Sequence, residues 1–151
     1  MLENFVLSTP TFGDMQMRLV DSKQRIYVAE CASKQKVTYD REDEMLMDDA
    51  LDLFWEELLP EAKEKIMCVF VPDVDQIIGE NRLEGFGNEN NTRVRNSYHG
   101  DKGEMWWTST SGVAKYTHFL VDINGGLISD ENDRRSAGFV PAVKLKSEVR
   151  L

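Results

Sequence analysis

Residues 105–146 read MWWTSTSGVAKYTHFLVDINGGLISDENDRRSAGFVPAVKLK, and this stretch decides the expected fold. Residues 116–123 have the composition of a strand, and the Gly125-Gly126 pair that follows predicts a turn. Residues 138–143 predict a last strand, interrupted on one side by Pro141, which donates no backbone hydrogen bond. We therefore expect this last strand to be structural and central.

The first 39 residues predict strands. Apolar, partly alternating runs at 15–20 and 25–29 flank a polar segment at 21–24, which is typical of a β-hairpin. Residues 1–10 predict an arm or a short edge strand. The N-terminal part of the chain is therefore expected to contribute further strands to the fold.

Residues 40–66 predict an acidic helical segment. Asp40 is the expected N-cap, because acidic residues follow it and apolar residues then recur at helical spacing. Pro60 either ends this helix or starts a second one over 61–66. Residues 40–64 hold eleven acidic and two basic side chains, so this segment accounts for the whole formal net charge of −9.

The middle of the chain is expected to form a strand and a long loop. Residues 66–71 are continuously apolar and predict a buried strand, and residues 74–79 predict one or two helical turns. Residues 81–102 are rich in Gly, Asn and charge, which indicates an irregular loop that is functional or disordered. Residues 67–151 thus comprise a strand, a loop and the C-terminal sheet.

Length and composition fit one domain over residues 1–151. No apolar run has membrane-spanning length, and the N-terminus does not resemble a signal peptide. Cys31 and Cys68 are far apart in sequence, which favours reduced thiols. We therefore expect no membrane association and a cytoplasmic location, that of the host cell if a phage encodes the protein. An acidic surface also disfavours direct nucleic-acid binding.

Two motifs carry a resemblance to a known family. Trp106-Trp107-x-Ser109 and the segment 138–142 (GFVPA) resemble the W-W-x-R-S and G-V-R-P-A motifs of a bacterial and prophage domain family of unknown function. That family looks related to the C-type-lectin-like fold of formylglycine-generating enzymes and phage receptor-binding proteins. The resemblance implies a single α+β domain with a mixed or antiparallel sheet and one principal acidic amphipathic helix. No cysteine follows Cys68, so it implies the scaffold and not formylglycine chemistry.

Candidate metal sites are weak in this sequence. His99 and His118 are the only histidines, and neither an HxxxH nor a CxxC spacing is present. Residues 122–126 begin like a calcium loop, but glycine occupies a ligand position and leucine replaces the required glycine. The acidic run 130–133 is the remaining candidate for a weakly held ion. We expect no metal, no cofactor and no catalytic residue; His118 is interpreted as structural or surface-exposed, with a binding role for His99 as an alternative.

These observations predict a non-enzymatic binding module. We expect a phage or mobile-element accessory protein that binds a host protein. Inhibition of that host protein is one form of this hypothesis. The expected partner is a basic nucleic-acid-handling protein. The alternative is a receptor- or ligand-binding module of adhesin or tail type, and a formylglycine-type enzyme ranks third. The acidic helix has its own alternative, a solvated face that only covers the core. The predicted partner surface comprises Asp48, Asp49, Asp52, Glu56, Arg93, Arg95, Tyr98, Trp107, Arg134 and Arg135, with Asp43 and Glu57 also expected to face outward.

Overall fold

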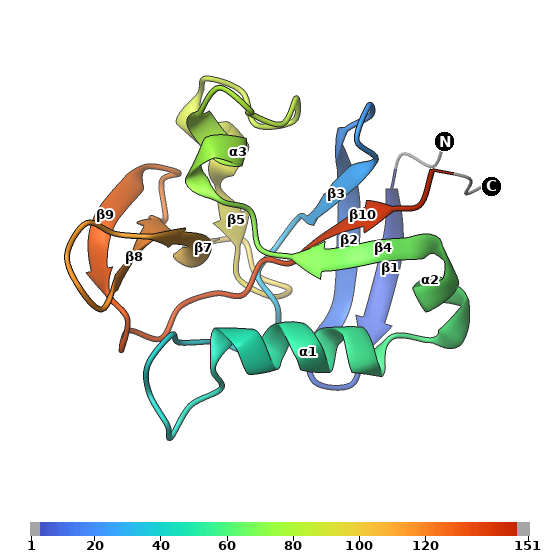
Figure 1. Cartoon of the computed structure of the whole chain (residues 1–151), viewed down its shortest axis with the longest axis horizontal. Helices are drawn as coiled ribbons and strands as arrows, with labels where there is room; N and C mark the ends of the chain where they lie inside the picture. The colour runs from blue at the N-terminus through green and yellow to red at the C-terminus, as the bar shows by residue number, and fades with distance from the viewer. Residues whose placement is uncertain (1–3, 148–151) are drawn as a thin grey trace.

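A five-stranded antiparallel sheet and a three-stranded antiparallel sheet form the two sides of the molecule in a computed structural model that describes residues 4–147 (Figure 1). The protein is therefore a small single-domain α+β protein, with few helices. Within the described residues, no helix is long and apolar enough to cross a membrane. The larger sheet has the order β1-β2-β3-β10-β4, and its strands are β1 (Asn4–Thr9), β2 (Gly13–Asp21), β3 (Ile26–Ala29), β10 (Ala142–Leu145) and β4 (Ile66–Phe70).

The predicted N-terminal hairpin is confirmed. Strands β2 and β3 pair antiparallel, with Met17 opposite Ala29 and Leu19 opposite Tyr27. All four residues of β3 are buried, which shows that both faces of this strand are covered, since successive side chains point to opposite faces of a sheet. The expected edge strand is also present as β1, which pairs only with β2 in the sheet; residues 1–3 of the predicted arm lie outside the described residues.

The last strand lies inside the larger sheet, between β3 and the edge strand β4. The strand begins at Ala142 and not at residue 138 as predicted. Pro141 explains the late start, since it has no N–H to donate, although its carbonyl accepts a bond from the Ala29 amide at 3.0 Å. The residues before it run between the two sheets: Ala137 bridges to Val37, and Gly138 bridges to Trp106.

The acidic segment forms two helices, α1 (Met47–Glu57) and α2 (Pro60–Lys65). The predicted N-cap at Asp40 is wrong, because the helix begins seven residues later. Thr38 bonds to the backbone of Met45 and Met47 at 3.0 and 2.9 Å, which turns residues 40–46 into a loop. The second helix begins at Pro60, so the alternative in which this proline starts a helix is confirmed.

Strand β4 exists where it was predicted but is not a buried strand. It lies at the edge of the sheet, where Met67 is 56% exposed and Cys68 is also exposed. A central strand cannot be distinguished by a continuous apolar run from an edge strand that has no pairing strand on its outer side.

The smaller sheet contains β7 (Trp106–Ser111), β8 (Thr117–Val121) and β9 (Leu127–Asn132). The predicted turn between β8 and β9 is present, and Gly125 adopts a φ of 86°, which glycine tolerates best. The Asp122 carboxylate accepts bonds from the Asn124 and Gly126 amides, both at 2.9 Å, so it holds the turn. Most of the acidic run 130–133 belongs to β9 and is not a loop.

Residues 74–104 connect the two sheets through short elements and turns. Leu83 and Phe86 are fully buried and anchor the long segment 81–102 to the core. This segment is therefore irregular, as predicted, but packed against the protein. Its short elements are α3 (Val74–Ile78), the 3-10 helix η1 (Asn90–Arg93), and the paired strands β5 (Arg95–Asn96) and β6 (Gly103–Glu104).

Candidate interaction surface

Four carboxylates on α1 face solvent without a partner. The side chains of Asp48, Asp49, Asp52 and Glu56 are exposed, and none of them forms an ion pair within 4.0 Å among residues 4–147. The opposite face of α1 buries Met47, Ala50 and Phe54 against the core. Since the core-facing stripe needs none of these carboxylates, their charge is available to a partner of opposite charge.

Two of these carboxylates border a groove between α1 and β4. The cavity has a volume of about 290 Å³, and its walls are otherwise largely apolar. Met67 on the outer edge of β4 is 56% exposed, and it lies across the groove from the helix. Acidic groups and exposed apolar surface are thus combined in one place, which is typical of a recognition site. The residues that line the groove are Leu51, Asp52, Trp55, Glu56, Met67, Cys68 and Val69.

Two acidic residues that we expected to face outward are already engaged within the protein. Glu57 accepts two hydrogen bonds from Thr11, from the amide at 2.9 Å and from the hydroxyl at 2.6 Å. Asp43 pairs with Arg41 at 2.8 Å, and the hydrogen bonds from this guanidinium lower the pKa of the Asp43 carboxyl. Asp43 still faces outward, with 70% of its side chain exposed, whereas Glu57 is only partly exposed. The four residues named above are therefore the members of the predicted acidic face that have no internal partner among the described residues.

The structure places Arg95 in the interior and not on a protein-contact surface. It is 8% exposed, and its guanidinium donates to the backbone carbonyls of Ala29, Thr92 and Val94. Arg93 is partly buried and donates to the Asn90 side chain at 3.0 Å and to nearby backbone carbonyls. These arginines were grouped by sequence with exposed residues, but the packed segment 81–102 encloses them.

The aromatic residues predicted as anchors are largely internal. Trp107 and Trp106 are both fully buried, so Trp107 is not an exposed platform. The Trp107 indole donates to the Val37 carbonyl at 3.2 Å. Tyr98 is half-buried, and its hydroxyl accepts a bond from the Asp14 amide at 2.9 Å. Trp107 therefore does not reach the partner surface to which the sequence assigned it, because protein covers both faces of β7 at the two tryptophans.

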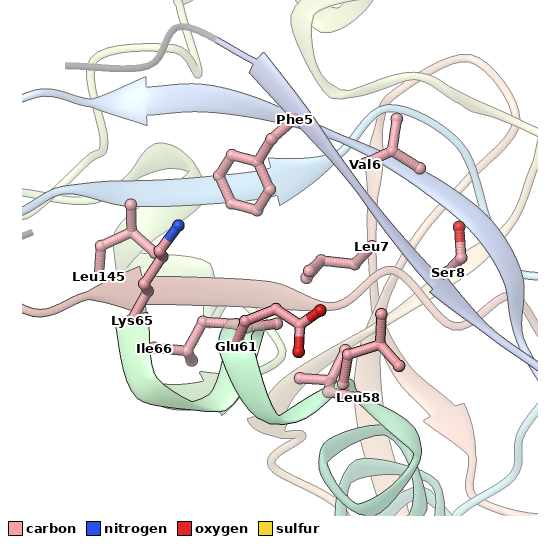
Figure 2. Close-up of a pocket in the computed structure, with 11 residues that line it drawn as sticks. Phe5, Val6, Leu7, Ser8, Leu58, Glu61, Lys65, Ile66 and Leu145 are labelled. Carbon is pink, nitrogen blue, oxygen red and sulfur yellow. The ribbon is translucent and has the colours of Figure 1, made fainter. Parts of the chain in front are cut away.

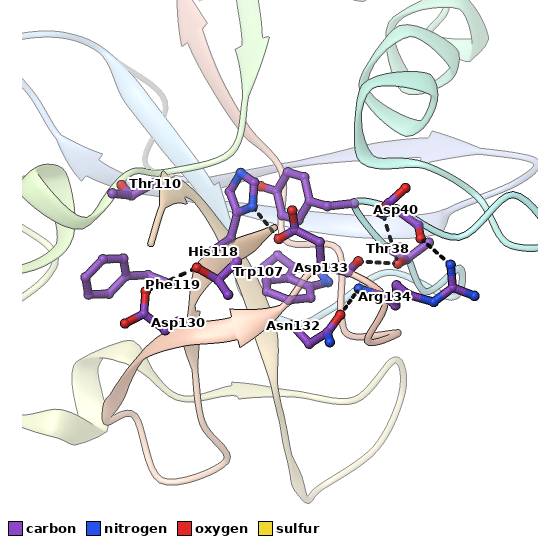
Figure 3. Close-up of polar contacts among 12 residues, drawn as sticks. Thr38, Asp40, Trp107, Thr110, His118, Phe119, Asp130, Asn132, Asp133 and Arg134 are labelled. Carbon is purple, nitrogen blue, oxygen red and sulfur yellow. Dashed lines mark hydrogen bonds and ion pairs between the residues drawn. The ribbon is translucent and has the colours of Figure 1, made fainter. Parts of the chain in front are cut away.

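Arg134 and Arg135 remain on the surface, just after β9. Arg134 lies beside the loop that precedes α1, where it donates to the Asp40 carbonyl at 3.4 Å (Figure 3). Arg135 pairs with Glu131 at 2.8 Å. The structure therefore brings Arg134 near the acidic segment, but neither arginine lines the groove between α1 and β4.

His118 and Asp133 form a largely buried pair that joins the smaller sheet to residues 38–39 (Figure 3). His118 Nδ1 lies 2.6 Å from Asp133 Oδ1, and the Tyr39 ring stacks on the imidazole at 3.6 Å. The Thr38 hydroxyl donates to the Asp133 backbone carbonyl at 2.7 Å. Among residues 4–147, no hydroxyl hydrogen-bonds to His118, and no group of three or more His, Cys, Asp or Glu side chains could hold a metal ion.

A second cavity of about 290 Å³ is apolar and lies between β1 and the helices (Figure 2). Phe5 and Leu7 of β1 approach it from one side, and Leu58 and Ile66 approach it from the helical side. Alternation along β1 places these two residues on one face, but the cavity exists only because α2 folds across from them. Lys65 is among its lining residues.

The geometry is thus that of a domain with an acidic groove and separate cavities. Comparison with known proteins adds no relative: no family model, no curated protein and no solved structure matches this chain.

Proposed function

We propose that this protein is a non-enzymatic binding module that captures a basic segment of a protein partner in the groove between α1 and β4. The main observation behind this proposal is that Asp52 and Glu56 line the same groove as Trp55 and Met67. Lysine or arginine side chains of the partner pair with the carboxylates, and apolar side chains occupy the groove. Such complementary charge increases association rate and specificity.

The edge of β4 supplies a way to hold the partner's backbone. This strand pairs with β10 on one side and has no strand on the other among the described residues. An extended segment that pairs with this edge gains backbone hydrogen bonds, and its alternate side chains face the groove. The partner segment is therefore proposed to be extended, with basic residues directed to α1.

The proposed biological setting is a phage or mobile-element accessory protein. The likeness of 106–109 and 138–142 to a prophage domain family supports this setting and a C-type-lectin-like scaffold. Host proteins that handle nucleic acids present basic surfaces to phosphate groups. A module with an acidic groove competes for such a surface and inhibits the host protein by occupying it.

The test is a pull-down from host lysate with mass spectrometry, followed by association kinetics with the captured protein. The variants are Asp48→Lys, Asp49→Lys, Asp52→Lys and Glu56→Lys. We expect slower association in the variants, most of all at the two groove positions, and a wild-type rate that falls with salt. Glu84→Lys makes the same charge change at an exposed residue outside the groove and is expected to leave the rate near that of wild type.

Melting temperatures complete this test, because exposed charges contribute little to stability. The hypothesis requires unchanged melting together with slower association. Wild-type rates in every variant at low salt would contradict it and would return α1 to the role of a solvated cover for the core.

A receptor- or ligand-binding module is the second candidate, and the apolar cavity beside β1 is the observation that favours it. Its volume of about 290 Å³ is near the lower end of small-molecule sites. Binding to intact cells or to a glycan array, without capture of a single host protein, is the result expected for this candidate. Leu58→Trp, which fills the cavity, is then expected to abolish binding, whereas Asp52→Lys leaves it intact.

A further inference from the structure

A third cavity, of about 350 Å³, is polar and lies between the larger sheet and the segment 81–102. Arg18 of β2 and Glu30 line one wall, and Asn91 and Arg95 line the other. Val20 and Val94 add apolar surface. None of these residues belongs to α1 or β4, so the cavity is separate from the proposed partner groove.

Arg95 is a buried cation whose charge no carboxylate balances at close range. Its Nε donates to the Ala29 carbonyl at 2.8 Å, and its Nη1 donates to the Thr92 and Val94 carbonyls at 3.0 Å. Its Nη2 has no hydrogen-bond partner among residues 4–147, and no acidic side chain in that range lies within 4.0 Å of the guanidinium. The rings of Phe86 and Trp106 lie 5.3 and 6.0 Å from Arg95 and account for part of its stabilisation.

The other charges around the cavity do not supply the missing anion. Glu30 is the only acidic side chain in the wall, and it pairs with Arg18 at 2.6 Å. Burial and, after it, the positive charge of Arg18 lower the pKa of Arg95 to about 10, and the charge of Glu30 offsets only part of this shift. Two cations and one anion therefore surround the space, which leaves a positive charge beside it in a protein that is otherwise strongly acidic.

We propose that this cavity binds a small organic oxyanion, a carboxylate or a phosphate ester, whose charged group lies between Arg95 Nη2 and Arg18. Guanidinium groups suit both anions because their planar N–H donors match the spacing of the acceptor oxygens. The Asn91 side chain has no hydrogen bond within the described residues and supplies a neutral donor at the mouth of the cavity. The cavity is larger than the charged group alone needs, so Val20 and Val94 contact the organic part of the ligand.

The direct test follows the Arg95 Nε–Hε signal by NMR in the full-length ¹⁵N-labelled protein. Sodium phosphate, sodium acetate and sodium chloride are titrated separately at matched ionic strength. We expect a saturable shift of this signal and a rise in melting temperature with phosphate, acetate or both, and no saturable change with chloride. A response to only one of the two oxyanions identifies the preferred charged group.

Three variants separate a built site from general charge effects. Arg18→Ala removes a donor and releases Glu30 toward Arg95, so we expect binding to weaken at least about tenfold. Asn91→Asp places a carboxylate at the mouth and is expected to remove the response to added anion. Lys115→Ala removes one exposed positive charge outside the cavity and is expected to bind as wild type.

Either of two results would overturn the proposal. One is an Arg95 signal that responds to chloride as strongly as to phosphate and acetate. The other is equal anion affinity in wild type, Arg18→Ala and Asn91→Asp, since Arg18 is exposed and its replacement leaves the core intact.

Discussion

The carboxylate of Glu57 at the end of α1 accepts both the amide and the hydroxyl of Thr11, at 2.9 and 2.6 Å, across 46 positions of sequence. This contact fastens the helix to the turn between β1 and β2. We expect Glu57→Ala to lower the free energy of unfolding by about 1–3 kcal/mol, because hydrogen bonds to a charged group are strong. Its neighbour Glu56 makes no such bond, so Glu56→Ala is expected to cost less than about 0.5 kcal/mol. Urea denaturation of both variants measures the difference, and equal costs would contradict this role of Glu57.

Trp107 is expected to be a residue of stability and not of binding. It is fully buried, and its indole donates to the Val37 carbonyl. Trp107→Ala leaves a large cavity and removes the indole hydrogen bond, so we expect a loss of about 3–5 kcal/mol. Val113→Ala is the control, because Val113 is 94% exposed and its truncation should change stability by less than about 0.5 kcal/mol. A Trp107→Ala variant as stable as Val113→Ala would refute the buried position.

The raised pKa of Tyr39 predicts a loss of stability in alkaline solution. Burial, helped by the negative charges of Asp133 and Asp48, raises the pKa of its phenol well above the ordinary value of 10.0. Below pH 10 the folded and unfolded states both keep the proton. Above that pH the unfolded state loses it first, so the free energy of unfolding falls by about 1.4 kcal/mol for each pH unit.

The measurement for Tyr39 is urea denaturation between pH 9 and pH 11. The pKa of Tyr27 is also raised by burial, so the wild-type slope contains both tyrosines. We therefore expect Tyr39→Phe to be less stable at pH 8 but to lose stability less steeply with rising pH. Parallel slopes for the two proteins would show that the Tyr39 phenol is as easily ionised in the folded state as in the unfolded one.

Removal of the C-terminal segment should abolish cooperative folding. Truncation after Ser136 deletes β10, which separates β3 from β4 in the sheet, and it also deletes the fully buried Phe139 and Val143. Without β10, strand β4 loses the one strand that pairs with it among the described residues. We expect no sharp thermal transition in calorimetry. A truncated protein that melted sharply near the full-length temperature would show that β10 is dispensable.

Features that depend on neighbouring residues were predictable from the sequence. The hairpin of β2 and β3 follows from alternation around a polar turn, and the turn at Gly125 follows from a residue that tolerates positive φ. The start of α2 at Pro60 has the same local origin, because proline has no amide to satisfy inside a helix. The exposure of Asp52 and Glu56 follows from the helical spacing of the core-facing residues Met47, Ala50 and Phe54.

Features that depend on distant partners were decided only by the tertiary structure. The start of α1 was misplaced because Thr38 binds Met45 and Met47, a pairing that no local signal shows. The sequence around Arg95 is typical of an exposed loop, but the fold buries its guanidinium among residues of β3 and of segment 81–102.

Likewise, the sequence of β4 is typical of a central strand, and Trp107 was assigned to an exposed surface. Whether an apolar strand is covered on both sides depends on the sheet order and on which segment packs over it. Composition and periodicity therefore indicated where most of the strands and helices lie, but not where α1 and β10 begin. The positions of the groove and of the polar cavity were set by long-range packing, because each is lined by residues that only the folded chain brings together.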